Sequence, residues 1–151
     1  MKVKNLDDTK KDYLENKNQS IIIIVDDNEE HLLMYKFLFT SINKNHKYLT
    51  FFSADKAIEK IKNLYNEDYR RIFNETGFIK LIISDYNMNP FDGLEFYKKV
   101  KEIDESLHFI LFSSFLSNSV IKKAYELGIV KCIKKELNIK ETVNKLRFHI
   151  V

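Results

Sequence analysis

The fold is decided by residues 21–28, which read Ile-Ile-Ile-Ile-Val-Asp-Asp-Asn. Five consecutive β-branched residues without polar alternation indicate a strand covered on both faces, as strands are at the centre of a parallel sheet. The acidic pair Asp26 and Asp27 ends this strand, and the apolar spacing that follows predicts a helix. The buried face of that helix is expected to consist of Leu33, Met34, Phe37, Leu38 and Ile42.

Strand and helix patterns alternate strictly along the rest of the chain. Further strands are predicted at residues 48–52, 79–84, 109–113 and 130–133, and a helical pattern follows each of them. This alternation implies an α/β fold in which parallel strands are joined by right-handed crossovers.

The composition is that of one soluble globular domain. A length of 151 residues leaves no room for two large domains, and 44% hydrophobic with 31% charged residues excludes a disordered chain. A single cysteine, Cys132, excludes an internal disulfide framework and fits a reducing cytoplasm. The net charge of +3 comes from scattered lysines, which gives no support for nucleic-acid binding. Residues 1–20 are polar, so we expect a flexible extension without a signal peptide, and no apolar run is long enough to span a membrane.

Residues that could carry chemistry stand just beyond the strand ends, where open parallel sheets bind their ligands. They are Asp26, Asp27, Asp85, Ser113, Ser114, Lys134 and Lys135. Carboxylates brought close together raise one another's pKa unless a cation accompanies them, and a few carboxylates with water suit Mg²⁺. A lysine in the same place indicates a second, anionic guest, most simply a phosphoryl group.

Together, four motifs resemble the receiver domain of two-component response regulators, over about residues 21–150. The motifs are IIVDD (23–27), IISDYNMNPFDG (82–93), LFSS (111–114), and Gly128 followed seven residues later by Lys135. The resemblance implies a flavodoxin-like, doubly wound sheet of five parallel strands in the order 2-1-3-4-5, with helices on both faces. It also implies that a phosphoryl group passes from a partner's phosphohistidine to an aspartate.

The resemblance assigns roles at the acidic end of the sheet. Asp85 matches the phosphoacceptor, and Asp26 and Asp27 match the acidic pair that holds Mg²⁺. The main-chain carbonyl of Asn87 matches the third protein ligand of that ion.

The remaining roles concern the phosphoryl group and the partners. Ser113 matches the hydroxyl residue that binds a phosphoryl oxygen, and Lys135 matches the lysine that pairs with the group. The implied partners are a sensor histidine kinase or histidine phosphotransfer protein and a downstream protein target, in the cytoplasm and without nucleic acid or membrane. Such a stand-alone, chemotaxis-type regulator would not be an enzyme, because it catalyses only its own phosphoryl transfer and dephosphorylation.

The chain departs from the family pattern at several positions. Asn89 stands where the family's proline is usual, and proline follows one residue later at position 90. Glu136 replaces the proline that normally follows the lysine, so the Lys135–Glu136 bond is expected to be trans unless it is unusually constrained. Cys132 replaces the usual aromatic switch residue and is expected to be a small buried hydrophobe. The segment at about 54–77 is longer than usual, as one long helix or two short ones.

Two other functions fit parts of the pattern. A pseudo-receiver would keep the fold and act as an interaction module without phosphorylation. A haloacid-dehalogenase-like phosphatase also uses Mg²⁺ and a nucleophilic aspartate after a strand, but it requires a second aspartate two residues later. Asn28 and Asn87 stand at the two corresponding positions here, which disfavours that class.

Overall fold

The computed structural model describes residues 19–151. Five strands form one sheet in the order β2-β1-β3-β4-β5, and every neighbouring pair is parallel, which confirms the predicted fold class and strand order. The predicted extension, residues 1–20, lies outside the described residues except for its last two, and Ser20 already belongs to β1. The strands are β1 (Ser20–Val25), β2 (Lys47–Phe51), β3 (Phe78–Ser84), β4 (Phe109–Ser113) and β5 (Cys132–Lys134).

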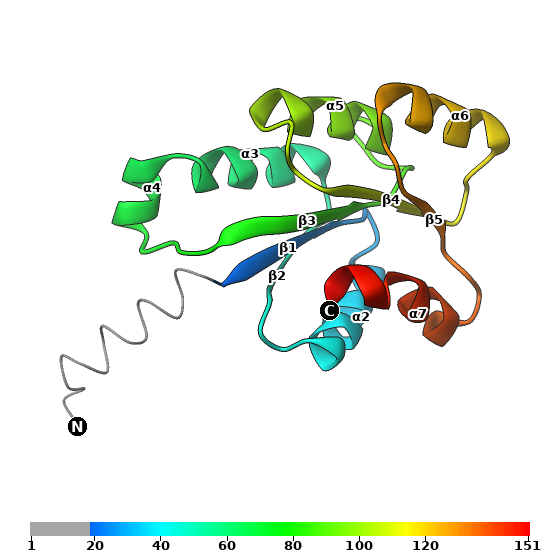
Figure 1. The fold of residues 1–151 in the computed structure, drawn as a ribbon, viewed down its shortest axis with the longest axis horizontal. Coiled ribbons are helices and arrows are strands. Elements are labelled where there is room, and N and C mark those ends of the chain that lie inside the picture. The colour runs from blue at the N-terminus through cyan, green and yellow to red at the C-terminus, as the bar shows by residue number, and fades with distance from the viewer. Residues whose placement is uncertain (1–18) are drawn as a thin grey trace.

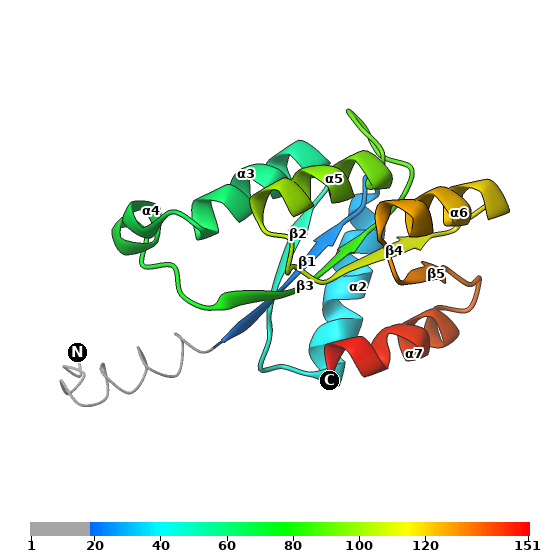
Figure 2. The same ribbon diagram turned by 45° about the horizontal axis from the view of Figure 1, so that its top comes forward.

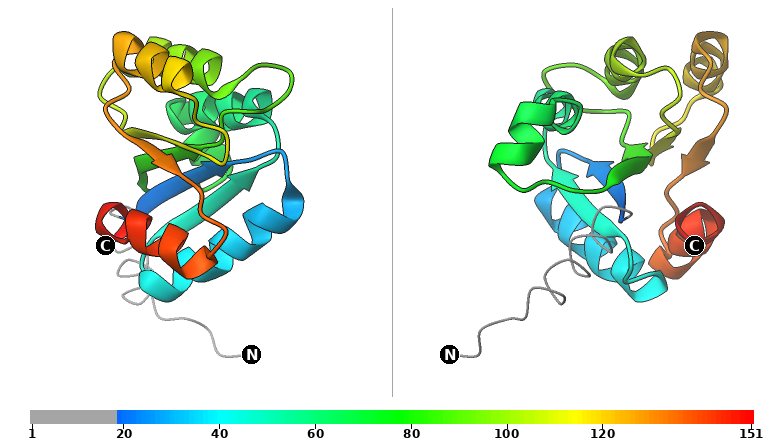
Figure 3. Two further views of the ribbon diagram at one scale, coloured as in Figure 1. Left: turned by 90° about the vertical axis from the view of Figure 1, so that its right-hand side faces the viewer. Right: turned by 60° about the vertical axis from the view of Figure 1, so that its left-hand side comes forward.

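Helices cover both faces of the sheet (Figures 1 and 3). On one face α2 and α7 contact each other, and α3, α5 and α6 lie on the opposite face. The helices are α2 (Glu29–Ile42), α3 (Ala54–Leu64), α4 (Glu67–Ile72), α5 (Gly93–Ile103), α6 (Asn118–Leu127) and α7 (Ile139–Ile150). Within the part of the chain that the structure describes, no helix is both long and apolar enough to cross a membrane.

The central strand β1 explains the unbroken apolar run of the sequence. Ile21, Ile23 and Val25 point into the core beneath α3, α5 and α6. Ile22 and Ile24 point into the second core, beneath α2 and α7. All five side chains are buried, and full burial of each contributes about 1.5–3 kcal/mol of transfer free energy. The sheet is therefore anchored by the strand that carries Asp26 and Asp27 at its end.

The predicted buried face of α2 is only partly right. The helix buries Leu32, Tyr35 and Phe39 instead, whereas Leu33 and Phe37 are each 74% exposed. The remaining predicted residues, Met34, Leu38 and Ile42, are only partly buried beside them. The buried face is set by Tyr35, whose ring meets Phe112 of β4 edge to face at 5.2 Å between centroids, and by Phe39, which stacks on Tyr35 at 5.8 Å.

The last strand begins later than predicted and includes Lys134. The sequence predicts a strand at residues 130–133, but Val130 is 83% exposed and β5 starts at Cys132. The reason is the end of α6: the amide of Ile129 still donates to the carbonyl of Ala124, so the chain leaves the helix too late to pair earlier.

The long segment at 54–77 forms two short helices, α3 and α4, and α4 turns away from the axis of α3 (Figures 1 and 2). The break occurs because the Asn66 side chain accepts a hydrogen bond from the amide of Tyr69 and so caps a new helix. Ser53 occupies the N-cap position of α3, but its side chain makes no capping hydrogen bond. Gly77 does not cap α4; it has a φ of +96°, and a Cβ there would lie 2.3 Å from the carbonyl oxygen of Gln19.

Glu75 ties this segment to the body of the domain. Its carboxylate accepts hydrogen bonds from Lys47 on β2, at 3.0 Å, and from Lys60 on α3. Burial of the carboxyl opposes ionisation, but the two lysines outweigh it and lower the pKa of Glu75.

Glu75→Gln is expected to lower the free energy of unfolding by about 1–2 kcal/mol at neutral pH, because both hydrogen bonds lose their charge assistance. A lowered folded-state pKa contributes stability that is complete above the unfolded-state pKa and disappears as the pH falls through the folded-state value. Urea unfolding at neutral and acidic pH should therefore show the wild-type and variant curves converging in acid. A difference that did not change with pH would mean that these ion pairs contribute nothing.

Candidate functional site

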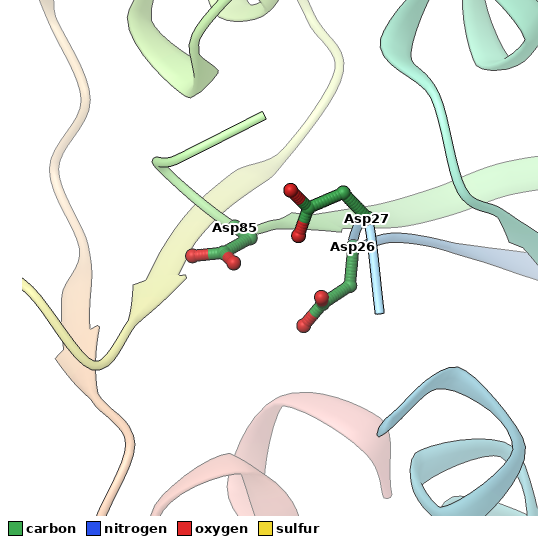
Figure 4. A group of neighbouring side chains, drawn as sticks. All are labelled: Asp26, Asp27 and Asp85. Atoms are coloured by element: carbon green, nitrogen blue, oxygen red, sulfur yellow. The ribbon is translucent and has the colours of Figure 1, made fainter. Parts of the chain in front are cut away.

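The ends of β1 and β3 bring three carboxylates together. Asp26, Asp27 and Asp85 each offer an oxygen, and these oxygens all lie within 4.8 Å of one another (Figure 4). The two strands are neighbours, and the amide of Asp85 donates to the carbonyl of Val25 at 2.9 Å, which fixes the two strand ends side by side. Asp26 is buried, Asp85 is half-buried and Asp27 is exposed, so the cluster opens toward solvent on the Asp27 side.

Asp26 is held by contacts on both of its carboxylate oxygens. Oδ1 accepts the amide of Asn28 at 2.9 Å, and Oδ2 accepts Lys135 Nζ at 2.5 Å. The Nδ1 atom of His31, on the first turn of α2, lies 3.7 Å from the same Oδ2. Two nitrogen-bearing side chains from distant parts of the chain thus converge on one buried carboxylate oxygen.

Lys135 supplies the positive charge of the cluster. Its side chain is buried, with Nζ 2.5 Å from Asp26 Oδ2 and 3.5 Å from Asp85 Oδ2, whereas the neighbouring Lys134 is exposed. The amide of Lys135 donates to the carbonyl of Ser113 at 3.0 Å, so the pairing with β4 continues one residue beyond β5. Of the two adjacent lysines, only Lys135 therefore reaches the carboxylates.

Two aromatic rings that are absent from the predicted site residues lie close to the amine of Lys135. Its Nζ lies 5.6 Å from the ring centroid of Tyr35 and 5.2 Å from that of Phe112, within cation–π range, and the two rings meet edge to face at 5.2 Å. Burial, with the charges of Asp26 and Asp85, raises the pKa of the Tyr35 hydroxyl, so the phenol stays neutral. The signal in the sequence was the i, i+4 spacing that places Tyr35 on the helix face one turn beyond His31.

The other predicted site residues lie on the adjoining strand and loop. Ser113 is buried at the end of β4, the neighbour of β3, and Asn87 is exposed two residues after Asp85. The loop is compact because the amide of Gly93 donates to the carbonyl of Tyr86 at 2.8 Å. A Cβ at Gly93 would lie 2.5 Å from the carbonyl oxygen of Asp85, so a larger residue there would displace the end of β3.

The departures from the family pattern have structural counterparts. Asn89–Pro90 is the only cis peptide bond among the described residues, so the Lys135–Glu136 bond is trans. Cys132 packs against the core but is half-buried rather than fully buried, which corrects the expectation from the sequence. Burial raises the pKa of its thiol.

The donor set fits Mg²⁺. Three carboxylates whose oxygens approach within 4.8 Å can share one hard cation, and the open side at Asp27 leaves room for the water ligands that Mg²⁺ retains. The Lys135 ammonium offsets part of their negative charge.

Comparison with known proteins gives the same architecture. The structures that resemble this chain include a response regulator receiver domain protein from Clostridium thermocellum, at 18% identity and a TM-score of 0.69, covering 87% of this chain and 90% of that one. A CheX–CheY–BeF3–Mg²⁺ complex from Borrelia burgdorferi matches at 20% identity and a TM-score of 0.67, covering 89% and 91%.

A curated relative is the "Uncharacterized transcriptional regulatory protein YesN" of Bacillus subtilis (strain 168), which is 31% identical over 81 residues. That match covers 54% of this chain, and it spans only 22% of the length of the relative. The family model described as "Response regulator receiver domain" matches residues 22–147. This range includes all the strands except the first two residues of β1, and it extends through most of α7. With this match over most of its length and with the same fold, the chain belongs to the response regulator receiver domain family.

Proposed function

We propose that this protein accepts a phosphoryl group on Asp85 from a partner's phosphohistidine and signals through protein contacts. The observation that carries the proposal is the convergence of Asp85 with Asp26, Asp27 and the buried ammonium of Lys135. A nucleophilic carboxylate, a place for a divalent cation and a fixed positive charge are the groups that phosphoryl transfer to an aspartate requires.

In the proposed reaction an oxygen of the Asp85 carboxylate attacks the phosphorus. The P–N bond to the donor imidazole breaks, an acyl phosphate forms on Asp85, and the leaving imidazole takes a proton from solvent. Asp85 is half-buried, so the nucleophile stays accessible to a donor from solvent, while the hydrogen bond from the amide of Tyr86 to its Oδ1, at 2.7 Å, orients the carboxylate.

A bound Mg²⁺ would neutralise negative charge on the transferred group, and Asp26, Asp27, Asp85 and the main-chain carbonyl of Asn87 are the residues that would hold it. Lys135 already lies between Asp26 and Asp85, and it would pair with the phosphoryl oxygens once the group is in place. The Ser113 hydroxyl, at the end of the next strand, would bind another of these oxygens.

The partners we propose are a sensor histidine kinase or a histidine phosphotransfer protein as donor and a downstream protein as target, in the cytoplasm and without nucleic acid. The chain would not act as an enzyme on other substrates. The CheX–CheY–BeF3–Mg²⁺ complex from Borrelia burgdorferi supports contact with a protein partner and binding of the ion.

The experiment that tests this function is intact-mass spectrometry after incubation with Mg²⁺ and acetyl phosphate. Gain of one phosphoryl group supports the proposal. A folded protein whose mass does not change would instead be a pseudo-receiver that acts as an interaction module.

Phosphorylation is expected to change the surface formed by β5 and α7 only weakly. Cys132 has neither the ring nor the length of the aromatic residue that the family usually moves at this position. We expect BeF3⁻ with Mg²⁺, a phosphoryl mimic, to shift the amide NMR signals of Asp85 and Ser113 strongly and those of Cys132 and α7 weakly. Large, cooperative shifts across β5 and α7 would show that the protein switches by another route.

A further inference from the structure

The turn that follows Lys135 is held by a buried hydroxyl. The Thr142 side chain, on the first turns of α7, is 1% exposed, and its Oγ1 accepts the amide of Glu136 at 2.8 Å. The same oxygen lies 3.3 Å from the carbonyls of Glu136 and Asn138, and its one proton can be donated to either. This hydroxyl therefore links the residue after the lysine to the helix that covers the sheet.

That hydrogen bond exists because position 136 is not proline. A proline has no amide hydrogen, whereas Glu136 brings a donor that the structure leaves only partly buried, and a donor shielded from water without a partner is costly. Thr142 supplies the partner. The Lys135–Glu136 bond is trans, so the turn does not have the geometry of a cis lysine–proline bond and needs its own means of support.

Two successive amides thus fix the backbone on either side of the Lys135 Cα. The amide of Lys135 is bonded to Ser113 on β4, and the amide of Glu136 is bonded to Thr142 on α7. With both peptide planes held, the Cα–Cβ bond of Lys135 has one direction, and Nζ reaches Asp26 and Asp85.

Capping of α7 does not account for this contact. The N-cap of the helix is Asn138, whose own side chain accepts the amide of Lys140. The second link between Glu136 and α7, an ion pair with Lys145, is largely exposed and contributes little.

We propose that Thr142 is the positioning residue for Lys135: its hydroxyl holds the turn after the lysine, where proline is usual in the family. The inference rests on the proposed function of Lys135 in pairing with the phosphoryl group. Its structural part, that the hydroxyl holds the lysine amine against Asp26, can be measured without any phosphodonor.

The test compares Thr142→Val, which keeps the shape but loses the hydroxyl, with Thr142→Ser, which keeps the hydroxyl. The first measurement is acetylation of lysine amines by an N-hydroxysuccinimide ester without phosphodonor, followed by mass spectrometry, with the exposed Lys134 as internal reference. The second is the rate of phosphorylation by acetyl phosphate and Mg²⁺. Glu136→Gln is the matched control, because it removes the charge facing Lys145 but keeps the amide.

We expect Thr142→Val to acetylate Lys135 about tenfold faster relative to Lys134 and to be phosphorylated about tenfold more slowly. Thr142→Ser and Glu136→Gln should stay within about twofold of wild type in both measurements. A Thr142→Val protein that melts at a lower temperature but keeps the wild-type acetylation ratio and rate would overturn the proposal, because Thr142 would then be merely structural.

If Thr142→Val alone does not fold, the same substitution can be tested in a protein that already carries Glu136→Pro. Glu136→Pro removes the amide that valine would leave unpaired, so Glu136→Pro and Glu136→Pro/Thr142→Val should protect Lys135 equally. Faster acetylation in the double variant would contradict the proposal. A wild-type protein that protects Lys135 but gains no phosphoryl group would refute the proposed function and leave the positioning contact standing.

Discussion

Asp85→Asn is expected to gain no phosphoryl group from acetyl phosphate and Mg²⁺, whereas the wild-type protein gains one. The amide of asparagine has almost the same shape as the carboxylate but is not a nucleophile, so the acyl phosphate cannot form. The side chain is only half-buried, so the substitution should not unfold the domain. Intact-mass spectrometry over a time course measures the result, and circular dichroism verifies the fold.

Asp92→Asn is the matched control for that variant. Asp92 lies in the loop after the same strand, but its carboxylate caps α5 by accepting the amides of Leu94 and Glu95, and asparagine is an equally good cap. This variant should be phosphorylated like the wild type. Equal phosphorylation of Asp85→Asn and Asp92→Asn would show that the nucleophile is a different residue.

Asp27→Ala tests the role of the metal ion separately from that of the nucleophile Asp85. It removes the most exposed of the three carboxylates while leaving Asp85 in place, so residual phosphorylation should be slow and should no longer depend on Mg²⁺. A rate that kept the wild-type Mg²⁺ dependence would place the ion elsewhere.

The fold could be predicted because its decisive signals are local. The unbroken run at residues 21–25 specifies a strand buried on both faces, and the alternation that follows specifies parallel strands. The positions of Asp26, Asp27 and Asp85 follow directly, since strand ends are fixed once the strands are known.

The sequence does not determine the features that depend on contacts between distant segments. The buried face of α2 was placed one residue out of phase because Leu33 and Phe37 are as apolar as the residues that are buried. What selects the true face is the edge-to-face contact of Tyr35 with Phe112, and only the folded sheet brings those two rings together. The contact of Thr142 with Glu136 was invisible for the same reason, because threonine near a helix start has many ordinary roles.

Lys135→Ala is expected to slow phosphorylation by roughly a hundredfold or more, the effect of removing one fixed charge that stabilises a transferring anion. Lys134→Ala should remain within about twofold of wild type, because Lys134 is exposed and lies outside the carboxylate cluster. Rates with acetyl phosphate, measured by mass spectrometry at saturating Mg²⁺, distinguish the two adjacent residues.

Mg²⁺ binding should survive the loss of Lys135. In this structure the ammonium occupies Asp26 Oδ2, so alanine frees a carboxylate oxygen rather than removing a ligand. The chain has no tryptophan, and Tyr35 lies beside the cluster, so tyrosine fluorescence can report Mg²⁺ binding. In a Mg²⁺ titration, Lys135→Ala should bind the ion as tightly as the wild type or more tightly.

If Lys134→Ala gave the slow phosphorylation instead, the lysine that acts would be the exposed one, and the buried contact with Asp26 would be structural. If Lys135→Ala lost Mg²⁺ binding as well, its slow rate would reflect a collapsed site rather than a missing charge.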